Sequence, residues 1–207
     1  MRKLPLHRRT LLAAALAVGF AAPAFAAPQI NTPAPAFRQL DQDGKPRSLA
    51  DFRGKTVVLE WTSAACPYSH KHYDSGNMQR LQAKARKQGV VWLTIITDAP
   101  GTSGYMDAAQ VRAWMKKEHS HATAVLLDSD ARVARAYEAK TTPHMFIIDK
   151  AGRLVYMGGI DDRPFTDPAS LKGAKNYVAL ALADLKAGRP IAEPVTRPYG
   201  CSVKYGP

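Results

Sequence analysis

The sequence predicts an α/β protein with one central mixed sheet and helices on both of its faces. Between residues 56 and 137, apolar β-branched runs alternate with segments of helical periodicity, a pattern typical of parallel strands joined by helices. Two further strand-like runs then flank a turn-rich Asp-Lys-Ala-Gly stretch, which predicts an antiparallel hairpin. Parallel strands followed by an antiparallel hairpin together give a mixed sheet.

Length, composition and charge are those of an ordinary globular protein. The chain has 207 residues, of which 46% are hydrophobic and 22% charged, so one folded domain is expected rather than a disordered or disulfide-dense chain. The formal net charge is +12, but basic and acidic residues alternate along the chain without a recognition-helix, zinc-finger or stacking-aromatic pattern. We therefore expect no nucleic-acid partner.

Residues 1–26 have the three parts of a signal peptide. A basic start ends at Arg9, an apolar run covers residues 11–20, and Ala-Phe-Ala at 24–26 offers a cleavage site. The apolar run is too short to span a bilayer comfortably, so a membrane anchor is the weaker interpretation. We expect an exported protein, periplasmic or extracellular, without stable membrane insertion; its route is either the general secretory or the twin-arginine pathway.

The elements of the mature chain are expected in the following order. Residues 27–36 are rich in Pro and Ala and predict a linker or extended lead-in to a domain over 37–187. That domain opens with a small hairpin, and a helix runs from Pro67 to Gln88 with Gly89 just past its end. The other expected strands are 56–61, 90–97, 124–127, 145–148 and 154–157, and the other helices are 108–119, 129–137 (with Asp128 or Ser129 as N-cap) and a segment around 178–185.

Residues 188–207 predict an extended tail that carries Cys201. The segment has no periodicity and contains four prolines. From Gly188 to Cys201, polyproline-like geometry reaches about 40 Å, which is about the diameter of a compact body of this size. The tail is therefore long enough to bring Cys201 to almost any point on the domain.

The two cysteines, Cys66 and Cys201, are the main candidates for chemistry. In an oxidising compartment such a pair is either a structural disulfide or redox machinery. Cys66 follows a strand and immediately precedes Pro67 and a helix. Unpaired N–H groups and the helix dipole stabilise a thiolate there, and the thiolate is the reactive form in disulfide exchange and peroxide reduction. A small buried core residue is the alternative interpretation of Cys66.

Several motifs, taken in order, carry a family resemblance. They are Glu-Trp-Thr-Ser-Ala-Ala-Cys-Pro-Tyr-Ser at 60–69, Lys-His-Tyr at 71–73, Ser-Gly-Asn-Met-Gln at 75–79, Thr-Pro at 142–143, Gly-Gly-Ile-Asp-Asp at 158–162 and Tyr-Gly-Cys-Ser-Val-Lys at 199–204. Over residues 33–205 the chain resembles the thioredoxin-like superfamily, in its redoxin or peroxiredoxin-like (AhpC/TSA-type) exported branch. The resemblance implies a thioredoxin-like fold and thiol oxidoreductase activity without a cofactor. It also implies a thiol or disulfide protein, or a peroxide, as substrate and leaves the electron donor unknown.

The resemblance also implies roles for individual residues. Cys66 would be the nucleophile, and Glu60, an acid inside an apolar strand, would accept a proton unless it reaches solvent at a strand edge. Ser69 stands where the superfamily has its second active-site cysteine, which leaves Cys201 as the resolving thiol. Substrate contacts are implied for Pro67, Tyr68, Ser69, Thr142 and Pro143, the last as a cis-proline beside Cys66.

Three alternatives stay open. The peroxiredoxin pattern Pro-x-x-x-Thr/Ser-x-x-Cys is matched by Ser63 but has Leu59 in place of the proline, so peroxide reduction is the runner-up. Copper could bind Cys66 with His70 and His144, but two or three ligands do not close a metal site, and no metal is expected. The third alternative is a purely structural disulfide between the two cysteines, worth about 5 kcal/mol on the loop-entropy model.

Overall fold

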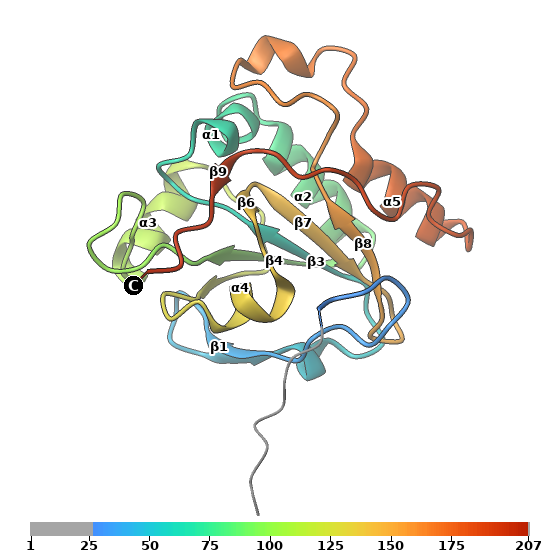
Figure 1. Ribbon diagram of the computed structural model, residues 1–207, viewed down its shortest axis with the longest axis horizontal. Coiled ribbons are helices and arrows are strands. Elements are labelled where there is room, and N and C mark those ends of the chain that lie inside the picture. Colours follow the sequence, from blue (N-terminus) through green and yellow to red (C-terminus); the bar gives the residue numbers. More distant parts are fainter. Residues whose placement is uncertain (1–26, 207) are drawn as a thin grey trace, which may run out of the picture.

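The computed structural model describes residues 27–206, and its centre is a five-stranded mixed sheet (Figure 1). The strand order is β5-β4-β3-β7-β8, with β3, β4 and β5 parallel and with β7 and β8 antiparallel to their neighbours. This is the sheet that the sequence predicted. The strands are β3 Val57–Trp61, β4 Val91–Ile96, β5 Ala124–Leu127, β7 His144–Ile148 and β8 Leu154–Gly158.

Helices cover both faces of the sheet. On one face, α1 (Pro67–Asp74), α2 (Asn77–Lys87), α3 (Ala108–Lys117) and α5 (Tyr177–Lys186) share a core with inward-facing residues such as Trp92 and Met145. On the other face, α4 (Arg132–Tyr137) shares a core around Trp61 with Phe37 and Leu49, which flank the hairpin of β1 (Arg38–Leu40) and β2 (Pro46–Ser48). Successive residues of a strand point to opposite faces, which is why Glu60 and Trp61 belong to different sides.

The helix expected over 67–88 is two helices. Gly76 has φ +69° and acts as the N-cap of α2, so the chain turns there and cannot continue the first helix. A left-handed conformation is tolerated by glycine at little cost, which makes this position a natural break. As a result, α1 is a separate two-turn helix that begins directly after Cys66.

The start of α4 also differs from the expectation. Neither Asp128 nor Ser129 is the N-cap, because Ala131 takes that position with φ +57°. The carboxylate of Asp128 nevertheless accepts the backbone N–H groups of Val133 and Ala134, both at 2.9 Å. It satisfies the free donors of the first turn from outside the helix, which is the chemistry expected of a cap.

Two terminal segments of the described chain run along the sheet rather than away from it. Asn31 donates its N–H to Leu154 O at 2.7 Å, so the Pro/Ala-rich lead-in lies against the start of β8. The tail leaves α5, passes β8 and reaches the start of α1, where β9 (Cys201–Ser202) pairs antiparallel with β6 (Thr141–Thr142); it then runs on towards the loop that precedes α3 (Figure 1). Within residues 27–206, no helix has the length and apolarity needed to cross a membrane. The expected signal peptide lies outside the described residues.

Short 3₁₀ segments complete the chain at Leu49–Phe52 and Pro168–Leu171. The second of these belongs to the connection between β8 and α5. That connection also contains Asp161, which is buried.

Candidate active site

The two thiols, 135 positions apart in sequence, meet at the start of α1. Cys66 is the N-cap of that helix, and Pro67 is its first residue. Cys201 lies opposite Thr142 in the β6–β9 pairing, and the Sγ of Cys66 is 2.9 Å from the carbonyl oxygen of Thr142. The side chains of Cys66 and Cys201 are free thiols that share a hydrogen bond.

The loop between β6 and β7 forms the floor of this site. The Thr142–Pro143 peptide bond is cis, as the sequence predicted, and both residues are buried. Gly200 passes so close to this loop that a Cβ on it would lie 2.0 Å from Thr142 O. Only a glycine lets the tail reach the position that places Cys201 beside Cys66.

The two thiols have pKa values displaced in opposite directions. Burial alone raises the pKa of the Cys66 thiol, but hydrogen bonds from the side chains of Cys201 and Thr142 lower it by more, and the net direction is down. Burial and the neighbouring Cys66 raise the pKa of Cys201 to about 12. The pair therefore favours a thiolate on Cys66 that is stabilised by a protonated Cys201.

The two sulfurs also differ in exposure. Cys66 is only 1% exposed, because the tail covers it, whereas Cys201 is partly exposed. A large reactant can approach Cys201 from solvent, but it can reach Cys66 only if the tail moves.

Glu60 is a fully buried acid in the middle of β3, not at a strand edge that reaches solvent. Its carboxylate accepts four hydrogen bonds in the described part of the chain, and Tyr73, one of the donors, belongs to α1. Burial raises the pKa of Glu60, although these donors act against the rise. The donors are Tyr73 at 2.8 Å, Trp92 at 2.7 Å, Thr94 at 3.1 Å and Gln82 at 3.2 Å.

The other residues with implied substrate contacts lie on the first turn of α1. Pro67 is exposed and Ser69 is 2% exposed. Tyr68 is half-buried and meets the ring of Tyr199 edge to face, with 6.0 Å between ring centroids. In this structure the tail, through Tyr199 and Cys201, occupies the surface next to these residues.

Four polar side chains to which sequence reasoning assigned no role gather beside the thiols. Lys71, His72, Asp161 and Tyr199 form what we call the Tyr199 cluster, and the first three are at most 1% exposed. One signal was available in the sequence: Lys-His-Tyr at 71–73 is a helical stretch next to the cysteine, and its first two polar residues had no assigned partner. Asp161 and Tyr199 lie in the motifs at 158–162 and 199–204, but nothing in those motifs indicates a contact with Lys71 or His72.

The histidines considered as copper ligands have other neighbours. The Nε2 of His70 lies 2.8 Å from Ala64 O, and the Nδ1 of His144 accepts the backbone N–H of Lys140 at 3.1 Å. Over residues 27–206, no three His, Cys, Asp or Glu side chains are grouped so that they could hold a metal ion.

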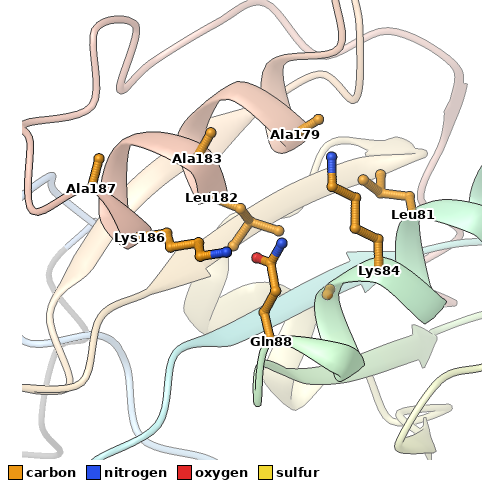
Figure 2. A pocket seen from close by; sticks show the side chains of 9 residues that line it. Leu81, Lys84, Gln88, Ala179, Leu182, Ala183, Lys186 and Ala187 are labelled. Atoms are coloured by element: carbon orange, nitrogen blue, oxygen red, sulfur yellow. The ribbon is translucent and has the colours of Figure 1, made fainter.

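A hollow of about 440 Å³ lies between α2 and α5, apart from the thiols (Figure 2). Its walls are apolar side chains such as Leu81 and Leu182, with Lys84, Gln88 and Lys186 at its rim. It contains neither cysteine, so it does not belong to the thiol site.

Comparison with known proteins identifies relatives of this chain. The thiol-disulfide oxidoreductase ResA of Bacillus thuringiensis subsp. konkukian is 26% identical over 127 residues, which are 61% of this chain and 68% of that protein. The crystal structure of an uncharacterized conserved protein from Geobacillus kaustophilus matches with a TM-score of 0.75 and 24% identity, over 86% of this chain and 93% of that one.

A third match fixes the fold type. The thioredoxin domain of a thiol-disulfide oxidoreductase from Bacteroides vulgatus aligns with a TM-score of 0.51 and 21% identity, over 62% of this chain and 87% of that one. The fold is therefore thioredoxin-like, as the resemblance implied. The model of the AhpC/TSA family matches residues 30–157, a region that contains Cys66 and the cis-proline loop, and the chain belongs to this family.

Proposed function

We propose that the protein is an exported thiol oxidoreductase in which Cys66 is the nucleophile and Cys201 the resolving thiol. Family and relatives support the coarser statement, an oxidoreductase of the thioredoxin type. The roles of Cys66 and Cys201 are supported by one observation: the two thiols are hydrogen-bonded, and their pKa values are displaced in opposite directions. A buried structural cysteine has no need of a lowered pKa, whereas an attacking thiol does.

The reaction we propose is thiol–disulfide exchange in two steps. The Cys66 thiolate attacks one sulfur of a substrate disulfide, forms a mixed disulfide and releases the other substrate sulfur as a thiolate. Cys201 then gives its proton to the released substrate thiolate and attacks the Cys66 sulfur. A Cys66–Cys201 disulfide forms, and the second substrate thiolate leaves. The substrate gains two electrons and the cysteine pair loses two.

The electrostatics of the pair favour this order of events. A thiolate on Cys66 is one reason why the pKa of Cys201 is high. Once Cys66 is part of a mixed disulfide its charge is gone, and the nearby Lys204 still lowers the pKa of Cys201. Cys201 therefore becomes a better nucleophile at the moment when it is needed.

When an external thiol reduces the disulfide form again, the difference in exposure selects the sulfur that is attacked. An external thiolate meets Cys201 first, because Cys66 is covered. Attack on Cys201 releases Cys66, and the thiol of lower pKa is the better leaving group. These features support reduction of the Cys66–Cys201 disulfide by an external thiol; a substrate thiol that the disulfide form oxidises would attack Cys66, in the reverse of the two steps above.

We also propose that Glu60 serves as a proton-holding residue behind α1 and that Pro67, Tyr68, Ser69, Thr142 and Pro143 contact the substrate. Glu60 acts through Tyr73, because its hydrogen bond reaches the helix that Cys66 begins. Access to the substrate contacts requires the tail to move away from the first turn of α1. A cysteine-containing protein is the proposed substrate, and the electron donor remains to be identified by experiment.

Export of the protein is part of the proposal. The signal features of residues 1–26 support it, and an oxidising compartment suits a chain whose two cysteines can pair. N-terminal sequencing of exported material should begin at Ala27; a retained Met1 in a membrane fraction would contradict export.

The single-cysteine variants test the two assigned roles. Cys201→Ser should accumulate mixed disulfides at Cys66, because the first step proceeds and the second has lost its nucleophile. Cys66→Ser should exchange at least about tenfold more slowly than Cys201→Ser with oxidised glutathione, because its remaining thiol, Cys201, has lost the contact with Cys66 but keeps a pKa that burial raises. Mass spectrometry of the intact variants reads out both results.

Parallel assays with hydrogen peroxide distinguish thiol–disulfide exchange from peroxide reduction, the second candidate activity. Ser63 occupies the Thr/Ser position of the peroxiredoxin pattern, but Leu59 replaces its proline and Cys66 is covered. We therefore expect disulfide exchange to be faster than peroxide reduction. A faster reaction with peroxide, or equal reactivity of the two variants with glutathione, would contradict the assignment.

A further inference from the structure

The Tyr199 cluster joins three segments that are distant in sequence. Lys71 and His72 lie on α1, Asp161 follows β8, and Tyr199 precedes Cys201 by two residues. The hydroxyl of Tyr199 donates to Asp161 Oδ1 at 2.5 Å. Lys71 Nζ lies 3.0 Å and His72 Nε2 lies 3.2 Å from the same hydroxyl oxygen.

The proton positions in the cluster follow from its contacts. Asn77 Nδ2 lies 2.8 Å from His72 Nδ1, and because an amide nitrogen only donates, Nδ1 is the acceptor. The proton of the neutral imidazole is then on Nε2, which donates to Tyr199. Burial and the charge of Lys71 lower the pKa of His72 to about 3, in agreement with a neutral ring. Tyr199 thus receives two hydrogen bonds and donates one.

The tail supplies the hydroxyl that bridges the two charged groups of the cluster. Lys71 Nζ and Asp161 Oδ1 are 3.8 Å apart, with side chains that are 0% and 1% exposed. That distance is too long for a direct hydrogen bond, and the hydroxyl of Tyr199 bridges the two groups. Lys71 also donates to Arg163 O at 2.6 Å and lies 4.8 Å from the centre of the Tyr199 ring. Removal of Tyr199 would leave a buried ion pair short of partners, which is costly.

We propose that the Tyr199 cluster is a docking site that fixes the tail in register and so places Cys201 against Cys66. This inference rests on the proposed function and assigns Lys71, His72, Asp161 and Tyr199 as positioning residues for the resolving step. Two residues of extended chain span at most about 7 Å, so anchoring Tyr199 confines Cys201 to a small volume.

The cluster also couples the tail to the helix that carries the nucleophile. Lys71 and His72 are five and six residues after Cys66, on the same short helix. After Cys201, the tail is held again, because Val203 donates to Lys140 O at 3.1 Å and Lys204 donates to Ser103 Oγ at 2.6 Å. The cysteine therefore lies between two anchors, and the anchor on the Tyr199 side is the one made of buried charges.

Tyr199→Phe is the sharpest test, because it removes only the hydroxyl and keeps the ring. The matched control is Tyr137→Phe, which removes a buried hydroxyl that donates to Pro35 O at 2.8 Å on the other face of the sheet. Glutathione redox buffers measure the equilibrium constant for the Cys66–Cys201 disulfide in the mature protein. We expect a decrease of about tenfold or more for Tyr199→Phe, since hydrogen bonds to charged groups are lost, and a change of less than about twofold for Tyr137→Phe.

A second measurement does not depend on disulfide formation. In the reduced protein, amide hydrogen exchange at Val203 and alkylation of the covered Cys66 should both be about tenfold faster in Tyr199→Phe than in Tyr137→Phe. Values within about twofold of each other in both experiments would overturn the docking site. If the wild-type cysteines never pair but exchange and alkylation still respond to Tyr199→Phe, the proposed function fails and the docking site stands.

Discussion

At the scale of single residues, each important property of the site comes from what surrounds an ordinary side chain. Cys66 and Cys201 carry the same side chain, but their pKa values differ. Cys66, at the start of α1, accepts a hydrogen bond, and Cys201 donates it. Sequence reasoning predicted the acidic position of Cys66, since a helix start follows from local pattern. It could not predict the raised pKa of Cys201, because that depends on a contact made across the fold.

Glu60 gives a prediction about stability and pH. Its folded-state pKa is raised, so the protonated acid is favoured in the folded protein. Its contribution is therefore fully present below the unfolded-state value of about 4.3 and is lost as pH rises through the folded-state pKa. Glu60→Gln cannot titrate. The free energy of unfolding of the wild type relative to Glu60→Gln should fall as pH rises from about 4 towards about 8.

Urea denaturation of both proteins over that pH range measures this difference. The same variant reports on the proposed chemical role, since the pH profile of Cys66 alkylation should move if Glu60 acts on the site through Tyr73. A stability difference that rises with pH would show that the acid is stabilised in its ionised form, contrary to this account.

At the scale of elements, the short pair β6–β9 decides where the chemistry takes place. It consists of two residues on each side, Thr141–Thr142 and Cys201–Ser202, and it has no period that a sequence pattern could show. The long strands were predicted because their residues are buried on both faces and read as continuous apolar runs. The break between α1 and α2 was missed because Met78, Leu81 and Ala85 keep helical spacing while Gly76 acts through its backbone alone.

Gly200→Ala tests the β6–β9 pair. A Cβ there would lie 2.0 Å from Thr142 O, so the tail must leave its place beside β6. Gly188→Ala is the matched control, because Gly188 also has a positive φ (+68°) but a Cβ on it would meet nothing within 4 Å. We expect Cys66 in Gly200→Ala to be alkylated at least about tenfold faster than in Gly188→Ala, since strand hydrogen bonds over Cys66 are lost.

An alanine is strained at both positions, and more so at Gly200, whose φ of +139° lies outside the left-handed helical region that Gly188 occupies, so the comparison measures the clash and the additional strain together. Mass spectrometry after timed alkylation gives the rates. Equal rates in the two variants would mean that the pairing with β6 does not cover Cys66.

At the scale of the whole molecule, the tail is the part of the fold that sequence reasoning could describe only by its length. The tail is long enough to bring Cys201 to almost any point on the domain. The position that the tail takes is set by two contacts. Tyr199 binds the buried cluster, and Val203, which is 7% exposed, packs in the core around Trp61. These contacts join segments that are far apart in the chain, and no local pattern encodes them.

Closure of this long loop predicts a stability difference between redox states. A disulfide between residues 135 positions apart restricts the unfolded chain and stabilises the folded protein by up to about 5 kcal/mol on the loop-entropy model. Denaturant unfolding of the oxidised protein should therefore show a higher midpoint than that of the reduced protein. Cys201→Ser, treated in the same way, should show no difference. Identical midpoints for the oxidised and reduced wild type would argue that the pair does not close.

The most direct test of the account is a redox titration of the mature protein, with alkylation and mass mapping of both cysteines at each potential. We predict one two-electron transition in which Cys66 and Cys201 become linked, at a potential between about −270 and −120 mV, the range of catalytic dithiols. Cysteines that never pair at any potential would contradict it. A Cys66–Cys201 disulfide with a reduction potential below about −300 mV would also contradict it, because such low potentials are typical of structural disulfides.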